Sequence, residues 1–325
     1  MLFIFVEAIF GKNEDKMKCR NRIYKEGALH HLYLKAIGGE VLFYRVEDYL
    51  VYFTLFCVLA RKYKLTVEAL CIMFNHTHSA LKAATKEIFR SFCRDLQSGF
   101  TKLQNEEYRR TGPMMMKSGY APKTSSKAAR SNIIYIANNA VEGLLCGHAI
   151  EYKWNFLAYY ANDHPFSEKL VKRHCRFRMR KSLSMVDRAA KQGSFLNYSL
   201  LAGIFEGLTP DEKLQMTDYI VVKYNVIDYE AMISRFGSFE KALSAFDLTT
   251  KGENDISEEW EDYSIYKVIL GEVLKKGIRG RDFGFESIDS LRLQRLVAAS
   301  SRKVAGHNKH IIRFFHLHPE RKRDL

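Results

Sequence analysis

The order of the apolar segments between residues 27 and 145 restricts the fold of this chain more than any other feature. Four short apolar segments have the length of strands, the first of them rich in aromatic and branched residues, and three longer segments have apolar residues at helical spacing. Along the chain we predict strands at 27–39, 65–74, 76–83 and 112–116, and helices at 45–64, 86–110 and 132–145. This strand, helix, strand, strand, helix, strand, helix order predicts an α+β, ferredoxin-like domain. In such a domain a split βαβ unit forms an antiparallel sheet with helices on one face.

Strand signals fade after about residue 163, and the remainder has helical patterns. Residues 208–224 begin with Thr209, a good N-cap, followed by Pro210, and residues 238–246 have a second helical pattern. A polar, acidic stretch near 248–259 has the composition of a linker. We therefore expect a leader at 1–18, the α+β domain at 19–164 and a mainly helical, DNA-binding or regulatory domain at 165–325.

Composition indicates a globular protein with an anionic partner. Hydrophobic residues make up 47% of the chain and only 5 residues are proline, whereas 51 Lys and Arg outnumber 37 Asp and Glu. An excess of this size is common in proteins that bind nucleic acids. The 6 cysteines form no Cys-x-x-Cys pair, which favours a reducing cytoplasm and argues against a cysteine zinc site. No stretch is long and apolar enough to predict a membrane span.

Two histidines interrupt the strand predicted at 76–83. Side chains alternate between the two faces of a strand, so His76 and His78 share one face while Thr77 points to the other. Two neutral imidazoles at this spacing can bind one divalent cation. The alternative is that both rings are hydrogen-bonded to the backbone or to water, and the pair alone does not separate these possibilities.

Three ordered motifs resemble those of REP-associated tyrosine transposases, a branch of the single-tyrosine HUH transposases of the insertion-sequence 200/605 type. "MFNHTHSAL" (73–81) is similar to the family's "MPNHxHLL" signature, and "YIANNAVEGLL" (135–145) followed by "EYKWNFLAY" (151–159) resembles "YIxxNPV" and its "Y+W" element. The stretch 20–39 resembles the first strand, "GxxYHVxxRG". The resemblance spans roughly residues 19 to 163.

The resemblance implies that His76, His78 and Asn139 hold a divalent metal and that Tyr135 is the nucleophile. Tyr135 and Asn139 are four residues apart in a predicted helix, so they lie on one face of it. Two imidazoles and one amide oxygen leave coordination positions open, and the oxygen donor favours Mg²⁺ or Mn²⁺. Tyr135 would attack a DNA phosphodiester, forming a 5′-phosphotyrosine and a free 3′-hydroxyl, and a later 3′-hydroxyl attack would rejoin a strand.

The chain departs from the family pattern at three positions, and its sequence does not indicate which group acts as the general base for Tyr135. Phe74 and Ala140 replace prolines, and Thr77 occupies a position that is hydrophobic in the family. These changes affect turn geometry and leave the implied metal ligands and nucleophile in place. An ordinary tyrosine has a pKa of about 10, so only about one molecule in a thousand is phenolate at neutral pH.

Basic segments supply candidate DNA contacts, because single-stranded DNA sites combine cations with stacking aromatic side chains. The candidates in the loop expected at 117–131 and in the segment 169–181 are Lys117, Lys123, Lys127, Arg130, Lys172, Arg173, Arg176 and Arg178. Each set has the alternative of being a solvated surface. Residues 291–319 resemble two short helices around a polar turn, loosely like a helix-turn-helix, with the alternative of a basic helical pair packed on its own domain.

We therefore expect a cytoplasmic, metal-dependent enzyme, a monomer or homodimer, that nicks and transfers single-stranded DNA at hairpin or repeat ends. One alternative keeps the fold without the reaction, as a domesticated DNA-binding protein. Others are an RNA binder that stacks bases on its sheet, and a metallohydrolase that uses metal-bound water.

Overall fold

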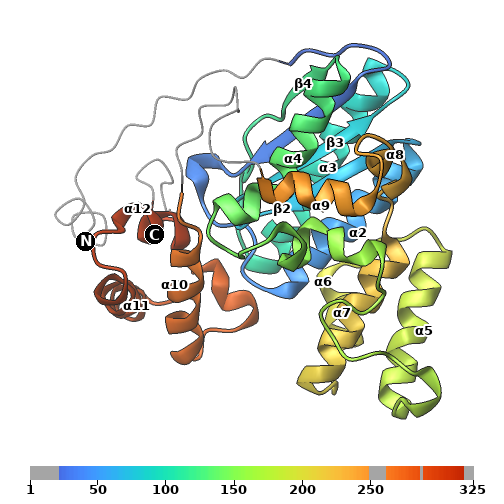
Figure 1. Cartoon of the computed structure of the whole chain (residues 1–325). Helices are drawn as coiled ribbons and strands as arrows, with labels where there is room; N and C mark the ends of the chain where they lie inside the picture. Colours follow the sequence, from blue (N-terminus) through green and yellow to red (C-terminus); the bar gives the residue numbers. More distant parts are fainter. Residues whose placement is uncertain (1–21, 249–260, 286–287, 318–325) are drawn as a thin grey trace.

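A four-stranded antiparallel sheet forms the centre of the computed structural model, which describes residues 22–248, 261–285 and 288–317 (Figure 1). Its strands are β1 (Leu29–Lys35), β2 (Thr66–Ile72), β3 (His76–Lys82) and β4 (Gly119–Lys123), in the order β2-β3-β1-β4. β3 pairs with β2 on one side and β1 on the other, so it lies inside the sheet. The α+β class and the antiparallel sheet predicted from the sequence are confirmed.

Helices cover both faces of this sheet. The helices of the sheet region are α2 (Val46–Lys62), α3 (Lys86–Tyr108) and α4 (Ser126–Glu142). α2 and α3 share one face: Phe56 of α2 meets Phe92 of α3 edge to face, with ring centroids 5.3 Å apart. α4 packs on the other face, against β2, β3 and β4. The third predicted helix, which follows the split βαβ order and corresponds to α4, therefore covers the face that α2 and α3 leave open.

Local sequence explains where α3 and α4 begin and end. Thr85 caps α3 by accepting a hydrogen bond from the Ile88 amide, and Ser125 caps α4 through the Ala128 amide. α4 thus starts at Ser126, six residues before the predicted helix at 132–145, because Ala128 and Ala129 extend the helix from this cap. It ends at Glu142, three residues before the predicted end at 145, and Gly143 is its C-cap.

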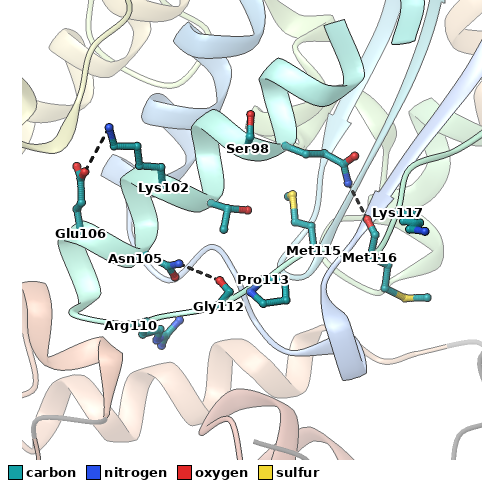
Figure 2. Close-up of a pocket in the computed structure, with 12 residues that line it drawn as sticks. Ser98, Lys102, Asn105, Glu106, Arg110, Gly112, Pro113, Met115, Met116 and Lys117 are labelled. Carbon is teal, nitrogen blue, oxygen red and sulfur yellow. Dashed lines mark hydrogen bonds and ion pairs between the residues drawn. The ribbon is translucent and has the colours of Figure 1, made fainter. Parts of the chain in front are cut away.

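The predicted strand at 112–116 and the predicted loop at 117–131 are both wrong. Pro113 has no amide hydrogen to donate, and of this segment only Met115 forms an isolated bridge, with Ala36. Backbone hydrogen bonds still join it to the end of β1 and the residues after it: the Met116 amide donates to the Lys35 carbonyl (2.8 Å), and the Ile37 amide donates to the Met114 carbonyl (3.0 Å). Side chains of α3 also hold the segment. Gln97 donates to the Met116 carbonyl (2.6 Å), and Asn105 donates to the Gly112 carbonyl (2.9 Å) beside a groove of about 670 Å³ (Figure 2). The fourth strand is β4, an edge strand that tolerates Pro122.

The described residues after β4 contain helices and no further strand. They form α5 (Phe177–Lys191), α6 (Tyr198–Phe205), α7 (Pro210–Tyr224), α8 (Tyr229–Ser234), α9 (Phe239–Leu248), α10 (Ser264–Lys275), α11 (Ser290–Lys303) and α12 (Asn308–Phe314), with short 3-10 turns between them. α7 has the predicted Thr209 cap, which is paired with Glu212 in a capping box. α6 and α7 pack on α2, whereas α10 to α12 lie on another side of the molecule (Figure 1).

Helices α11 and α12 confirm the two short helices predicted in this region. α12 also packs on the sheet region. The Arg313 carbonyl accepts the Val41 amide at 3.1 Å, and the Tyr44 hydroxyl donates to the Phe314 carbonyl at 2.7 Å. α12 therefore packs on the loop that follows β1. The leader at 1–18 and nearly all of the linker at 248–259 lie outside the described residues.

Two further properties follow from the described residues. The described cysteines, Cys57, Cys71, Cys93, Cys146 and Cys175, are free thiols. Helices within the described ranges are too short or too polar to span a bilayer.

A fully buried carboxylate, that of Asp48, links three helices of the fold. Its oxygens accept the amides of Tyr44 and Arg45 (2.8 and 3.0 Å) at the start of α2. They also accept the hydroxyls of Tyr108 at the end of α3 (2.6 Å) and Tyr198 at the start of α6 (2.8 Å). Burial, followed by the charge of Asp48, raises the pKa of both phenols well above the usual value, so both stay protonated and donate.

We expect Asp48→Ala to lower the free energy of unfolding by roughly 3–5 kcal/mol, because it leaves three buried donors and one partly buried donor without an acceptor. Urea denaturation measures this change. Glu47→Ala, which removes the neighbouring acid, is the matched control and should cost about 0.5 kcal/mol or less. Equal effects of the two substitutions would contradict the role given to Asp48.

Candidate functional site

The central strand β3 presents both histidines to the face that α4 covers. Thr77 points the other way, where its hydroxyl is 2.8 Å from the hydroxyl of Tyr52 in α2. His78 lies opposite Tyr33 of β1 and Cys71 of β2, and His76 lies opposite Lys35. His76 is 2% exposed and His78 is fully buried, so the pair lies beneath the surface.

α4 brings the other two predicted side chains to the histidines. The Asn139 Oδ1 is 3.0 Å from His76 Nε2, and the Tyr135 ring meets the His78 ring edge-on with centroids 5.1 Å apart. The two histidine rings are themselves 4.9 Å apart. The structure thus gathers His76, His78, Asn139 and Tyr135 in one place, from one strand and one helix.

Asn75 fixes which nitrogen of His76 carries a proton. The Asn75 amide group donates to the Gly39 carbonyl (2.7 Å), so its Oδ1 faces His76 Nδ1 at 2.7 Å as an acceptor. In a neutral imidazole the proton must then lie on Nδ1, and Nε2 directs its electron pair toward Asn139. Either the Asn139 amide turns to donate its NH₂ to that pair, or a cation binds both the nitrogen and the amide oxygen.

Three aromatic side chains at the site are absent from the sequence prediction. His31 Nε2 is 2.8 Å from His78 Nδ1, so one imidazole donates to the other, and Tyr33 packs on His78 with ring centroids 4.6 Å apart. His31 and Tyr33 have the same i, i+2 spacing as the predicted pair, a signal that was available in the first strand. Tyr263, whose hydroxyl is 3.3 Å from His76 Nδ1, has no such signal because it follows much later in the chain.

The "Y+W" element supports the site from outside it. The Tyr152 hydroxyl donates to the Ile72 carbonyl at the end of β2 (2.8 Å), and Trp154 stacks on Tyr49 of α2 with centroids 4.5 Å apart. Burial raises the pKa of Tyr152 well above its usual value. Tyr152 therefore has a structural role: its hydroxyl holds the end of β2, just before the turn that leads to His76.

The candidate DNA contacts divide into two groups with different surroundings. Lys117, Lys123, Lys127 and Arg130 lie on or beside β4 and the start of α4, and within the described residues no ion pair involves them. The other four have partners in their own region: Lys172 contacts Tyr219 and Asp187, Arg173 contacts His174, Arg176 pairs with Glu212, and Arg178 pairs with Glu206. Figure 1 shows α5, which carries the last of these, well apart from α4. The first group is thus better placed to serve this site.

The donor set at the site differs from that of an acidic or cysteine metal centre. Among the residues that the structure describes, no three His, Cys, Asp or Glu side chains gather in a way that could hold a metal ion. A cation at this site would therefore use the Asn139 oxygen together with the imidazoles.

One solved structure is similar to part of this chain. No family model matches the chain, and no curated protein matches it. A solved structure described as "Structure of the REP associates tyrosine transposase bound to a REP hairpin" is similar over 45% of this chain and 86% of its own, with 14% identity and a TM-score of 0.39. A superposition this loose does not establish a shared fold, so the function rests on the site itself.

We expect metal-free His76 to carry its proton on Nδ1 at pH 8, because Asn75 offers an acceptor there. Long-range ¹H–¹⁵N correlation spectra of ¹⁵N-histidine-labelled protein distinguish the two tautomers. Asn75→Leu removes the acceptor and should give a mixture of both. His30 accepts the Lys25 amide through Nε2 (3.0 Å) and is an internal reference that should keep its Nδ1 proton. An Nε2 proton on wild-type His76 would contradict this assignment.

Proposed function

We propose that the chain cuts and rejoins single-stranded DNA through a covalent bond to Tyr135, at hairpin or repeat ends. The observation that carries this proposal is the convergence of two imidazoles, an amide oxygen and a phenol on one face of the sheet. Phosphoryl transfer to tyrosine needs a nucleophile beside groups that stabilise charge on the phosphate. The two imidazoles, the Asn139 amide oxygen and the Tyr135 ring lie close together in this structure.

The donor chemistry of the site fits a divalent cation. The Nε2 electron pair of His76 faces the Asn139 amide, and these two groups with His78 form an open ligand set suited to Mg²⁺ or Mn²⁺. When bound, such an ion would polarise the scissile phosphodiester and neutralise charge on its oxygens. Asn75 and His31 would orient the two imidazoles, as groups behind metal ligands commonly do.

Tyr135 carries the covalent step. Its oxygen attacks phosphorus, the bond from phosphorus to the 3′ oxygen breaks, and that oxygen leaves as a 3′-hydroxyl with the proton that the phenol gives up. The product is a 5′-phosphotyrosine on Tyr135. Attack by a 3′-hydroxyl on this linkage restores the phenol and joins a strand.

The sheet order supports the finer fold assignment within the proposal. In the order β2-β3-β1-β4, β3 lies between β1 and β2, and α2 connects those two strands. A split βαβ unit requires this insertion, and β4 then pairs with β1. We therefore propose a ferredoxin-like HUH domain at 19–164, followed by a helical region at 165–325.

Four cations on or beside β4 and in the first turns of α4 supply the DNA contacts of the proposal, namely Lys117, Lys123, Lys127 and Arg130. They precede Tyr135 in the chain and would neutralise the phosphates of a strand that approaches the site. The enzyme would act in the cytoplasm as a monomer or homodimer. Tyr135 is only 9% exposed, so DNA binding must open the covered face before the reaction.

The same burial supports one alternative, a protein of this fold that binds DNA without cutting it. It would bind hairpin DNA through the same cations and form no covalent product. The experiment below separates this alternative from the main proposal.

We expect the protein to form a DNA adduct that survives denaturation when it is incubated with Mg²⁺ or Mn²⁺ and labelled hairpin oligonucleotides with randomised flanks. Gel electrophoresis after denaturation measures the adduct. Tyr135→Phe should abolish it, and chelation of the metal should reduce it at least tenfold. Tyr160→Phe, which alters a tyrosine that is 39% exposed, is the control and should leave the adduct unchanged.

Three results would count against the proposed reaction. An adduct that persists in Tyr135→Phe would place the nucleophile elsewhere. Cleavage without an adduct would indicate attack by water, as in a metallohydrolase. Binding without cleavage would support the DNA-binding alternative.

A further inference from the structure

Arg313 of α12 lies against the turn that follows β1, far along the chain from the residues of the site. Its Nε donates to the Gly38 carbonyl (3.1 Å), its own carbonyl accepts the Val41 amide, and the residue is 5% exposed. Gly39 has φ of +70°, and a Cβ there would lie 2.8 Å from the Arg313 Cζ. The guanidinium thus packs directly on the backbone of a turn that only glycine suits.

Two hydrogen bonds connect this turn to His76, the candidate metal ligand. The Gly39 carbonyl accepts the amide group of Asn75, and the Asn75 oxygen accepts the proton of His76 Nδ1, each at 2.7 Å. Asn75 is fully buried, so no solvent replaces these partners. A shift of the turn would turn the Asn75 amide and release the His76 ring.

A second set of contacts connects the Arg313 guanidinium to His76 Nδ1. Arg313 Nη1 donates to both oxygens of Glu261 at 2.7 Å, and Tyr263, two residues later, places its hydroxyl 3.3 Å from His76 Nδ1. Burial favours a raised pKa for Glu261, but the charge and hydrogen bonds of Arg313 outweigh it and lower the pKa. Glu261 therefore stays ionised and holds the guanidinium at neutral pH.

We infer that Arg313 is a positioning residue of the site, which fixes the tautomer and orientation of His76 through the Gly38–Gly39 turn and through Glu261 and Tyr263. The inference rests on the proposed function only for the role of His76 as a metal ligand. In this role α12, together with α10 and α11, forms part of the site, and removing these helices would release the His76 ring. This role differs from that of a separate DNA-binding or regulatory domain, which the sequence predicts for this region.

The geometry requires an arginine. Nε and Nη1 of the planar guanidinium donate in two directions at once, to the Gly38 carbonyl and to Glu261. A lysine ammonium is a single point charge on a flexible stem and cannot hold both partners in one plane. Arg313→Lys should therefore keep the charge and lose the positioning.

The experiment compares Arg313→Lys and Arg313→Met with wild type by two readouts. The first is the tautomer of His76 in metal-free, ¹⁵N-histidine-labelled protein at pH 8, which needs neither metal nor activity. The second is the Mn²⁺ affinity measured by titration calorimetry. We expect both tautomers in both variants and a Mn²⁺ affinity lower by about 10- to 100-fold, the usual effect of losing a group behind a metal ligand.

Arg302→Met is the matched control, since it removes an exposed arginine from the neighbouring helix α11 and should leave both readouts unchanged. Circular dichroism checks the fold of each variant. If Arg313→Met does not fold, Glu261→Gln weakens the same anchor without changing side-chain size and should move both readouts in the same direction.

Failure of this inference differs from failure of the proposed function. Wild-type protein that binds no Mn²⁺ would overturn the proposed metal site, while the tautomer of His76 would still test Arg313. A folded Arg313→Met protein with the wild-type tautomer and Mn²⁺ affinity within twofold of wild type would overturn the inference.

Discussion

The site depends on the register of β3, the strand hydrogen-bonded on both sides. Side chains alternate along a strand, so a slip by one residue would exchange its two faces. Thr77 would then face α4, and His76 and His78 would enter the apolar layer under α2, where Tyr52 now meets Thr77. Burying two imidazoles there without hydrogen-bond partners would cost several kcal/mol of folding free energy. The different surroundings of the two faces of the sheet therefore fix the register of β3.

Around this strand, polar groups are buried as a connected network. His31 binds His78, Asn75 and Asn139 flank His76, and the strands and α4 exclude water from all of them. In such surroundings a hydrogen bond is stronger than in water, and an unmet donor or acceptor is more costly. The network therefore restricts the orientations of the two imidazole rings.

The network extends beyond the sheet through contacts that are very distant in sequence. Arg313 and Gly38 are 275 positions apart, yet they are joined by a direct hydrogen bond. Asp48 has a similar role near the start of α2, where it joins α3 and α6. The helices after residue 164 thus pack on several separate parts of the sheet region, α6 and α7 on α2, α8 on β2 and α9 on α4, instead of forming one layer of their own.

The sequence by itself determined the α+β order of the sheet region, most helix positions and the shared face of His76 and His78, whereas Tyr135 and Asn139 were predicted from the resemblance of their motif to a known family. Hydrophobic period, caps and the i, i+2 and i, i+4 spacings are local, so they can be read without knowing the fold. The strand predicted at 112–116 is wrong because Pro113 cannot donate to a ladder and the segment forms only an isolated bridge, and the sequence does not predict the contribution of Tyr263 and Arg313. Only the tertiary structure decided these, because partners for buried polar groups come from whichever distant segment packs beside them, and no local pattern records that choice.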